Sequence, residues 1–147
     1  MSGDPSAGPR APAWYLDTSA ATKLVLPEAE SAPLRAWCDR TSADGGRIII
    51  SDLVRAELLR TVRRHDPDLL PFARGAAARF GRLAVTRRCF DASAAIAPPV
   101  LRTLDALHLA TALQLGSALA GIVTYDDRLA GAADLQGVAR TAPGRDR

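Results

Sequence analysis

Histidine, cysteine and lysine are scarce in this 147-residue sequence, and each scarcity excludes a kind of site. Cys38 and Cys89 stand alone, without a CxxC pair or histidines at ligand spacing, so neither a zinc site nor a disulfide scaffold is predicted. His65 and His108 are the only histidines, which argues against a mechanism that needs several imidazoles. Lys23 is the only lysine, so arginine supplies nearly all of the positive charge. The net charge of +3 permits an anionic partner such as nucleic acid without requiring one.

Signals for export or membrane insertion are also lacking. The N-terminus has no apolar segment typical of a secretory signal, and unpaired cysteines suit a reducing compartment, so we expect a cytoplasmic protein. Residues 106–125 carry no charge, and a stretch of that length could span a bilayer. Because polar residues and glycines interrupt it, we interpret it as a buried helix, a turn and a buried strand, and we expect no membrane partner.

The order of apolar runs predicts one domain of the α/β class. Short runs predict buried strands at residues 14–16, 48–50, 83–85 and 122–125, with helices between them. Strands that alternate with helices imply a three-layer α/β/α arrangement with a mostly parallel central sheet of four to five strands. We place the domain at residues 13–141, and we expect flexible tails at residues 1–12 and 142–147.

Four acidic residues occupy positions that suggest a shared site. Asp17 and Asp126 each follow a predicted strand, and in a parallel sheet the carboxyl ends of the strands share one edge. Glu57 lies in a predicted helix, and Asp105 lies in the first turn of another. Each acid also has a structural explanation, as a helix cap, a partner of the helix dipole or, for Glu57, a surface pair with Arg60.

Two details favour the shared site over these separate explanations. Glu57 falls at the border of the apolar stripe of its helix, next to Leu53 and Thr61, and not among the arginines. Asp105 is the only charge in a helix that is otherwise suited to complete burial. Because a lone buried charge is costly, Asp105 is expected to have a partner.

Four short blocks of sequence contain these acids. They are residues 16–20 (LDTSA), 51–58 (SDLVRAEL), 104–112 (LDALHLATA) and 123–130 (VTYDDRLA). Together and in this order they resemble the PIN-domain ribonucleases, and within them the VapC-type toxins of type II toxin–antitoxin systems. The resemblance extends from about residue 14 to about residue 140, so residues 13–141 are expected to form a PIN-like nuclease domain.

The resemblance implies a catalytic metal site formed by Asp17, Glu57, Asp105 and Asp126. It also implies that Ser19 and Thr124 support the ions or the phosphate. Asp127 could replace Asp126, but the register favours Asp126, with Asp127 as a supporting acid. Carboxylate oxygens suit Mg²⁺ or Mn²⁺, and two such ions can activate a water and stabilise the leaving oxygen of an in-line attack.

The resemblance also implies partners. The substrate would be single-stranded or looped RNA (a tRNA or an rRNA), cut to leave a 5′-phosphate and a 3′-hydroxyl. A cognate antitoxin would obstruct the acidic site, and a homodimer would form through helices near residues 29–59. Candidate RNA-binding residues are Arg55, Arg60, Arg63 and Arg64, with a solvated basic face as the alternative. We interpret His108 as a hydrogen-bonded core imidazole, with substrate contact as the alternative.

Two other functions are compatible with parts of the pattern. A catalytically silent PIN-like module could bind RNA or protein, although the presence of all four acids gives no sign of degeneration. A haloacid dehalogenase-like phosphatase also places an aspartate after its first strand. That chemistry needs a second aspartate two residues later, where this chain has Ser19.

Overall fold

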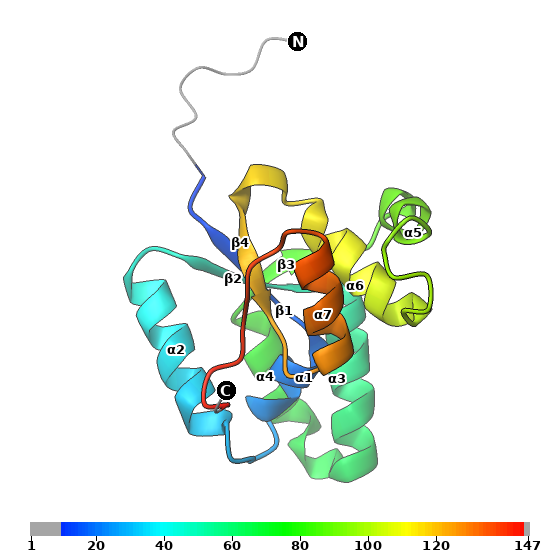
Figure 1. Cartoon of the computed structure of the whole chain (residues 1–147). Helices are drawn as coiled ribbons and strands as arrows, with labels where there is room; N and C mark the ends of the chain where they lie inside the picture. Colours follow the sequence, from blue (N-terminus) through cyan, green and yellow to red (C-terminus); the bar gives the residue numbers. More distant parts are fainter. Residues whose placement is uncertain (1–9, 146–147) are drawn as a thin grey trace.

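The computed structural model describes residues 10–145, which form a three-layer α/β/α domain around a parallel sheet (Figure 1). Most of the first predicted tail (residues 1–9) and the last two residues (146–147) lie outside the described residues. The strands of the described part are β1 (Ala13–Leu16), β2 (Arg47–Ser51), β3 (Gly81–Leu83), β4 (Leu119–Val123) and β5 (Arg140–Thr141). Their order is β3-β2-β1-β4-β5, and every pairing is parallel. The predicted fold class is confirmed.

Seven α-helices connect these strands within residues 10–145. They are α1 (Thr18–Lys23), α2 (Ser31–Ala43), α3 (Asp52–His65), α4 (Leu70–Ala78), α5 (Arg87–Ser93), α6 (Thr103–Leu113) and α7 (Asp127–Leu135). Two short 3₁₀ turns, Pro67–Leu69 and Gly116–Ala118, precede α4 and β4. Residues 106–125 form α6, a turn and β4, as predicted. Within the described residues, every helix is too short or too polar to cross a membrane.

Strand β1 lies at the centre of the sheet and carries much of the core. Tyr15 and Leu16 are fully buried, and β2 and β4 flank them on either side. Helix α6 is buried along most of its length, as its apolar sequence predicts, with Leu109 and Ala112 fully buried. The hydrophobic contacts of this core fix the ends of β1 and β4, from which two of the four acids project.

The strands differ from the predicted ones at three places. Strand β4 comprises residues 119–123, where residues 122–125 were predicted, because its pairing with β1 runs from Leu119 to Val123 and ends there. Strand β3 comprises residues 81–83, two residues earlier than predicted, because these residues pair with Ile49, Ile50 and Ser51. The two-residue strand β5 was not predicted individually, since so short a segment has no readable periodicity. Pro143 lies just after β5, and its carbonyl accepts a hydrogen bond from the Tyr125 hydroxyl at 2.7 Å.

Gly121 in β4 is required by close packing, and this gives a first prediction. A Cβ atom at this position would lie 2.5 Å from the Trp14 ring and 2.6 Å from the Ala139 carbonyl oxygen. We expect Gly121→Ala to lower the free energy of unfolding by about 1–3 kcal/mol through overpacking, measured by chemical denaturation. Gly131→Ala in α7 is the control, because no atom lies within 4 Å of its added methyl and a helical alanine should stabilise by about 0.5–1 kcal/mol. Equal stability of the two variants would contradict this account.

Candidate active site

The four acids predicted from the sequence project from elements that meet at the carboxyl end of the sheet. Asp17 directly follows β1, and Asp126 lies between β4 and α7. Glu57 is in the second turn of α3, and Asp105 is in the first turn of α6. Helix α1 packs against α3, and α6 packs against α7, which brings the four segments to one side of the molecule (Figure 1).

Asp17 is buried at the N-terminus of α1 and is held by several hydrogen bonds. Its side chain caps the helix, because Oδ1 accepts from the Ala20 N–H at 2.9 Å. The Ser19 hydroxyl donates to the same oxygen at 2.6 Å, and the Thr124 hydroxyl donates to Oδ2. Burial raises the pKa of Asp17, and these hydrogen bonds only partly oppose that rise. Asp17 therefore caps α1 and is also a buried carboxylate whose ionised form is destabilised by burial.

Ser19 and Thr124, the two hydroxyls predicted to support the site, connect Asp17 to the segment after β4. The Ser19 hydroxyl accepts from the Tyr125 N–H at 2.9 Å while it donates to Asp17. The Thr124 hydroxyl accepts from the Asp126 N–H at 3.1 Å while it donates to Asp17. The two hydroxyls thus link Asp17 to the backbone between β4 and α7, Ser19 at Tyr125 and Thr124 at Asp126.

Glu57 is half-buried, and two side chains hold one of its oxygens. Oε1 accepts from the Thr18 hydroxyl at 2.9 Å and lies 2.6 Å from His108 Nε2. Burial alone would raise the pKa of Glu57, but the contacts with His108 and Thr18 outweigh it and hold the pKa below its usual value. Glu57 therefore belongs to the interior network and does not depend on a surface pair with Arg60.

Asp105 is half-buried, and within residues 10–145 no hydrogen bond holds its carboxylate. Burial raises the pKa of Asp105, and the negative charge of Asp126 raises it further. His108 and Arg102 oppose this rise, and the charge of Glu57 adds a smaller increase. Asp105 therefore lies close enough to Asp126 and to Glu57 for their charges to disfavour its ionised form.

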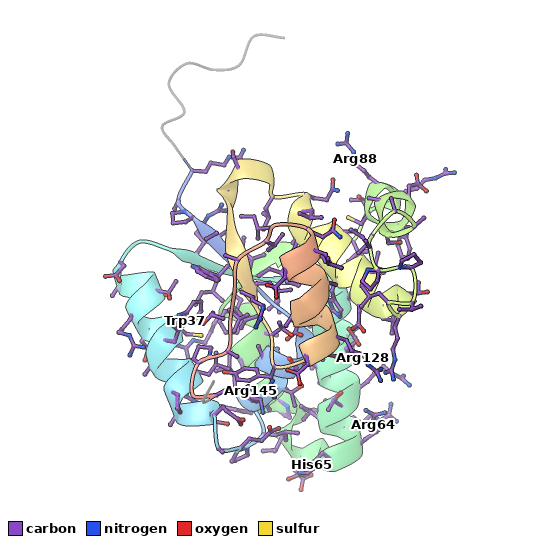
Figure 2. The ribbon with its side chains drawn as sticks, viewed as in Figure 1. Trp37, Arg64, His65, Arg88, Arg128 and Arg145 are labelled. Carbon is purple, nitrogen blue, oxygen red and sulfur yellow. The ribbon has the colours of Figure 1, made fainter. Side chains whose placement is uncertain are left out.

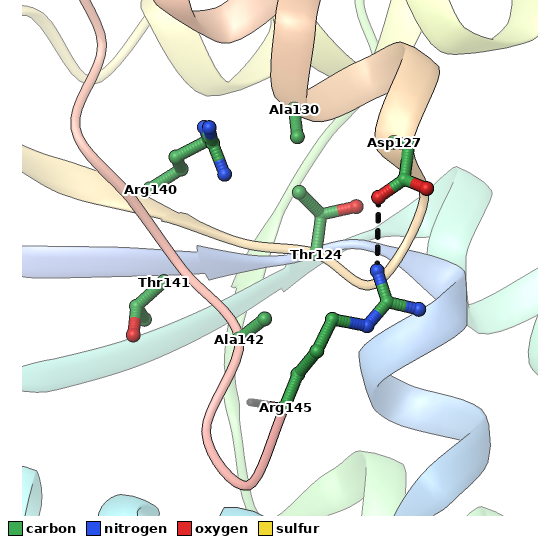
Figure 3. Close-up of a pocket in the computed structure, with 7 residues that line it drawn as sticks. All are labelled: Thr124, Asp127, Ala130, Arg140, Thr141, Ala142 and Arg145. Carbon is green, nitrogen blue, oxygen red and sulfur yellow. Dashed lines mark hydrogen bonds and ion pairs between the residues drawn. The ribbon is translucent and has the colours of Figure 1, made fainter. Parts of the chain in front are cut away.

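The geometry distinguishes Asp126 from its neighbour Asp127. Asp126 is half-buried, and its Oδ1 accepts from the N–H groups of Arg128 and Leu129, at 2.8 and 3.3 Å, as the cap of α7. The Asp127 side chain is 95% exposed and pairs with Arg145 at 3.0 Å, beside a small pocket of about 120 Å³ (Figure 3). The positions of the two side chains favour Asp126 as the fourth acid.

The donor chemistry of the site fits a hard divalent cation. Within the described residues, no three His, Cys, Asp or Glu side chains converge as a ready-made metal cage. Mg²⁺ does not need such a cage, because it keeps several waters and is commonly bound through one or two carboxylates. In the described part of the chain, Glu57 Oε2, Asp126 Oδ2 and both oxygens of Asp105 are free of protein hydrogen bonds. These oxygens are the available ligands.

The residues that hold Glu57 from the interior were not predicted as a group. His108 is buried, as expected of a core imidazole, but its Nε2 contacts Glu57 and its Nδ1 lies 2.8 Å from the Tyr15 hydroxyl. The Tyr15 hydroxyl lies 2.8 Å from Ser51 Oγ. One signal was available, because His108 is three residues after Asp105 and so faces the same side of α6.

The four candidate RNA-binding arginines of α3 are all exposed, but they do not share one face. Arg60 and Arg64 are three and seven residues after Glu57, positions on the same side of the helix. Arg55 is two residues before Glu57 and faces away from it. Figure 2 shows Arg64 on the same flank of the molecule as Arg128 of α7, which follows the fourth acid.

The fold and the edge of carboxylates define a class of protein that comparisons identify. The family model for the PIN domain matches residues 14–135, so the chain belongs to the PIN domain family. Within that family it is a VapC-type protein. It is 43% identical to ribonuclease VapC35 of Mycobacterium tuberculosis over 136 residues, which cover 90% of this chain and 98% of the relative. It is 41% identical to ribonuclease VapC46 of the same species over 131 residues, which cover 89% and 98% of the two chains.

Solved structures with low sequence identity share the fold. VapC20 of Mycobacterium tuberculosis, described as a sarcin-ricin loop cleaving toxin, has a TM-score of 0.66 at 17% identity, over 88% of this chain and 99% of its own. VapBC2 from Rickettsia felis, bound to a DNA fragment from its promoter, has a TM-score of 0.67 at 13% identity, over 89% and 98%. Membership in the PIN family excludes the dehalogenase-type phosphatase.

Proposed function

We propose that the protein is a Mg²⁺- or Mn²⁺-dependent endoribonuclease and the toxin of a type II toxin–antitoxin pair. The observation that carries the proposal is that the elements bearing Asp17, Glu57, Asp105 and Asp126 converge at one edge of a PIN fold. Relatives at 38–43% identity that are named ribonucleases support the activity. The coupling of Asp105 to both Asp126 and Glu57 supports a shared cation site, because carboxylates that repel one another gain from a cation between them.

In the proposed mechanism the four acids would hold the cations at the end of the sheet. Bound cations would supply an activated water and stabilise charge on the leaving oxygen of the phosphodiester. Asp17 contributes a carboxylate whose orientation Ser19 and Thr124 fix from both sides. Asp105 contributes a carboxylate without protein hydrogen bonds in residues 10–145, which is free to face the cations and the scissile phosphate. Asp127 would act only as a neighbouring charge.

We further propose that the substrate is a tRNA or an rRNA and that a cognate antitoxin blocks the acidic edge. VapC20, with the same fold, cleaves the sarcin-ricin loop, and VapBC2 is a complex with a promoter fragment. These neighbours support a structured RNA target and a protein partner for this chain. A homodimer through helices near residues 29–59, which include α2 and part of α3, completes the proposal.

A cleavage assay separates the nuclease from a silent PIN-like module. Purified protein is incubated with total RNA and Mg²⁺, with Mn²⁺, or with a chelator. We expect discrete fragments with 5′-phosphates in the presence of either metal and intact RNA with the chelator. RNA binding without cleavage in all three conditions would favour the silent module.

The placement of the arginines gives a prediction for RNA affinity. We expect the double substitution Arg60→Gln and Arg64→Gln to make the plot of log K against log[salt] for RNA binding less steep. The slope should fall by roughly 0.7 per lost phosphate contact on a single strand. Arg55→Gln with Arg63→Gln removes the same charge from positions that do not follow Glu57 on its face, and should change the slope less. The slopes come from binding titrations at several salt concentrations. Equal slopes for the two double variants would show that none of the four arginines contacts RNA selectively and would favour the solvated basic face.

A further inference from the structure

A chain of buried polar side chains runs from the end of β2 to Glu57. Ser51 Oγ lies 2.8 Å from the Tyr15 hydroxyl, which lies 2.8 Å from His108 Nδ1, and His108 Nε2 lies 2.6 Å from Glu57 Oε1. Tyr15, Ser51 and His108 are each less than 4% exposed. Burying three polar groups is costly unless each finds partners, and here each one does.

The partners determine where the hydrogens lie. The Glu57 carboxylate has no hydrogen to donate, so its 2.6 Å contact with His108 places the shared hydrogen on His108 Nε2. In the neutral ring Nδ1 is then the acceptor, and the Tyr15 hydroxyl donates to it. A tyrosine phenol keeps its hydrogen at neutral pH, because its usual pKa is about 10. Ser51 accepts from the Val54 N–H at 3.1 Å and donates to Tyr15, so every hydrogen has an acceptor.

These hydrogen bonds engage only one of the two Glu57 oxygens. Both donors to Glu57, Thr18 Oγ1 and His108 Nε2, contact Oε1. Oε2 has no hydrogen bond in the described part of the chain. A carboxylate held through one oxygen from the interior presents its other oxygen in a fixed direction. Partners that orient a ligand in this way commonly contribute about 10- to 100-fold to metal affinity or activity.

We propose that His108 is a positioning residue for Glu57, and that Tyr15 and Ser51 fix the His108 ring in its Nε2–H form. This inference rests on the proposed function, because it assigns Glu57 Oε2 to the cation site. It assigns no catalytic contact to His108, which is 3% exposed and has both ring nitrogens engaged. Its effect on the reaction passes through the orientation of Glu57.

The first test observes the ring itself in metal-free protein. Because the chain has only His65 and His108, long-range ¹H–¹⁵N spectra can assign both rings, with exposed His65 as an internal reference. We expect His108 to carry its hydrogen on Nε2, and Tyr15→Phe to shift the Nδ1 resonance. Tyr125→Phe is the matched control, since it removes another buried hydroxyl that bonds to the Pro143 carbonyl. A hydrogen on Nδ1 in the parent, or no change in Tyr15→Phe, would overturn the proposal.

The second test measures Mn²⁺ affinity by calorimetry on variants whose fold is checked by thermal melting. We expect His108→Leu to weaken Mn²⁺ binding by about 10- to 100-fold. His108→Gln keeps an N–H donor near Glu57 and should restore most of the affinity. Parental affinity in a folded His108→Leu variant would refute the positioning role. Equal losses in both variants would do so too, because they would show that only packing matters.

Two further variants keep this inference separate from the proposed function. If His108→Leu does not fold, Tyr15→Phe takes its place, and an affinity equal to that of Tyr125→Phe contradicts the proposal. Asp105→Asn tests the cation site without touching the chain of Ser51, Tyr15 and His108. Loss of Mn²⁺ binding in Asp105→Asn with normal binding in His108→Leu rejects the positioning role alone. Normal binding in both rejects the cation site itself.

Discussion

Asp105→Asn is expected to reduce metal-dependent RNA cleavage by about 100- to 1,000-fold while the protein stays folded. Losses of this size are typical when one preorganised charge-stabilising group is removed from an active site. Asparagine has nearly the same shape, and within residues 10–145 no hydrogen bond to the Asp105 carboxylate would be lost. The measurement is the initial rate of cleavage under saturating Mg²⁺, together with a thermal melt of the same sample.

The matched control for this experiment is Asp134→Asn. Asp134 is exposed on α7 and pairs with Arg140 at 2.9 Å, so its substitution removes one negative charge outside the acidic edge. We expect parental cleavage rates from this variant. Asp17→Asn should be as inactive as Asp105→Asn. It is the less selective probe, because Asp17 also caps α1 and accepts hydrogen bonds from Ser19 and Thr124. Full activity in folded Asp105→Asn would end the metal-site proposal.

The parts of the fold that the sequence predicted are those with strong local patterns. The buried run before Asp17 predicted β1, and the β-branched run at residues 48–50 predicted β2. The sequence of residues 104–115, which is apolar on nearly all sides, predicted the buried α6. Hydrophobic periodicity was enough to fix the order of strands and helices, and with it the edge at which Asp17 and Asp126 lie.

The missed parts depend on contacts that no local pattern encodes. The register of β3 follows from its pairing with β2, and β5 has only two residues. The contact of His108 with Glu57 joins residues 51 positions apart, and its contact with Tyr15 joins residues 93 apart. Such contacts require the packed core, since α6 and β1 must be placed before His108 can reach either partner. The sequence could therefore predict the acids but not the network that holds them.

The stability of metal-free protein should depend on pH through Asp105. Its pKa is raised, because burial and the charges of Asp126 and Glu57 disfavour the ionised form. The folded state then binds its proton more tightly than the unfolded state does. The resulting stability is present below the unfolded pKa and is lost as pH rises through the folded pKa. The pKa of Asp17 is also raised, so its contribution to stability is likewise lost as pH rises. The pKa of Glu57 is lowered, so its contribution is lost as pH falls.

Comparison with Asp105→Asn isolates the contribution of one acid. The variant cannot titrate at this position, so its melting temperature relative to the parent should increase from acidic toward neutral pH without metal. It also loses a favourable interaction with the N-terminus of α6, worth about 0.3–1 kcal/mol. At neutral pH we therefore expect a net effect that is neutral to stabilising. A difference in melting temperature between parent and variant that does not change with pH would show that the pKa of Asp105 is not raised in the folded protein.

Added Mg²⁺ should stabilise the parent, and it should stabilise Asp105→Asn much less. A cation that binds only the folded protein stabilises it by mass action, by about 2.7 kcal/mol at a concentration 100-fold above its dissociation constant. In the parent the cation also relieves the repulsion among Asp105, Asp126 and Glu57, which asparagine has already reduced in the variant. We expect Mg²⁺ to raise the parental melting temperature clearly and that of Asp105→Asn only slightly, at constant ionic strength. Equal shifts in the two proteins would place the bound Mg²⁺ away from Asp105, and the acidic edge would lose its role as the cation site.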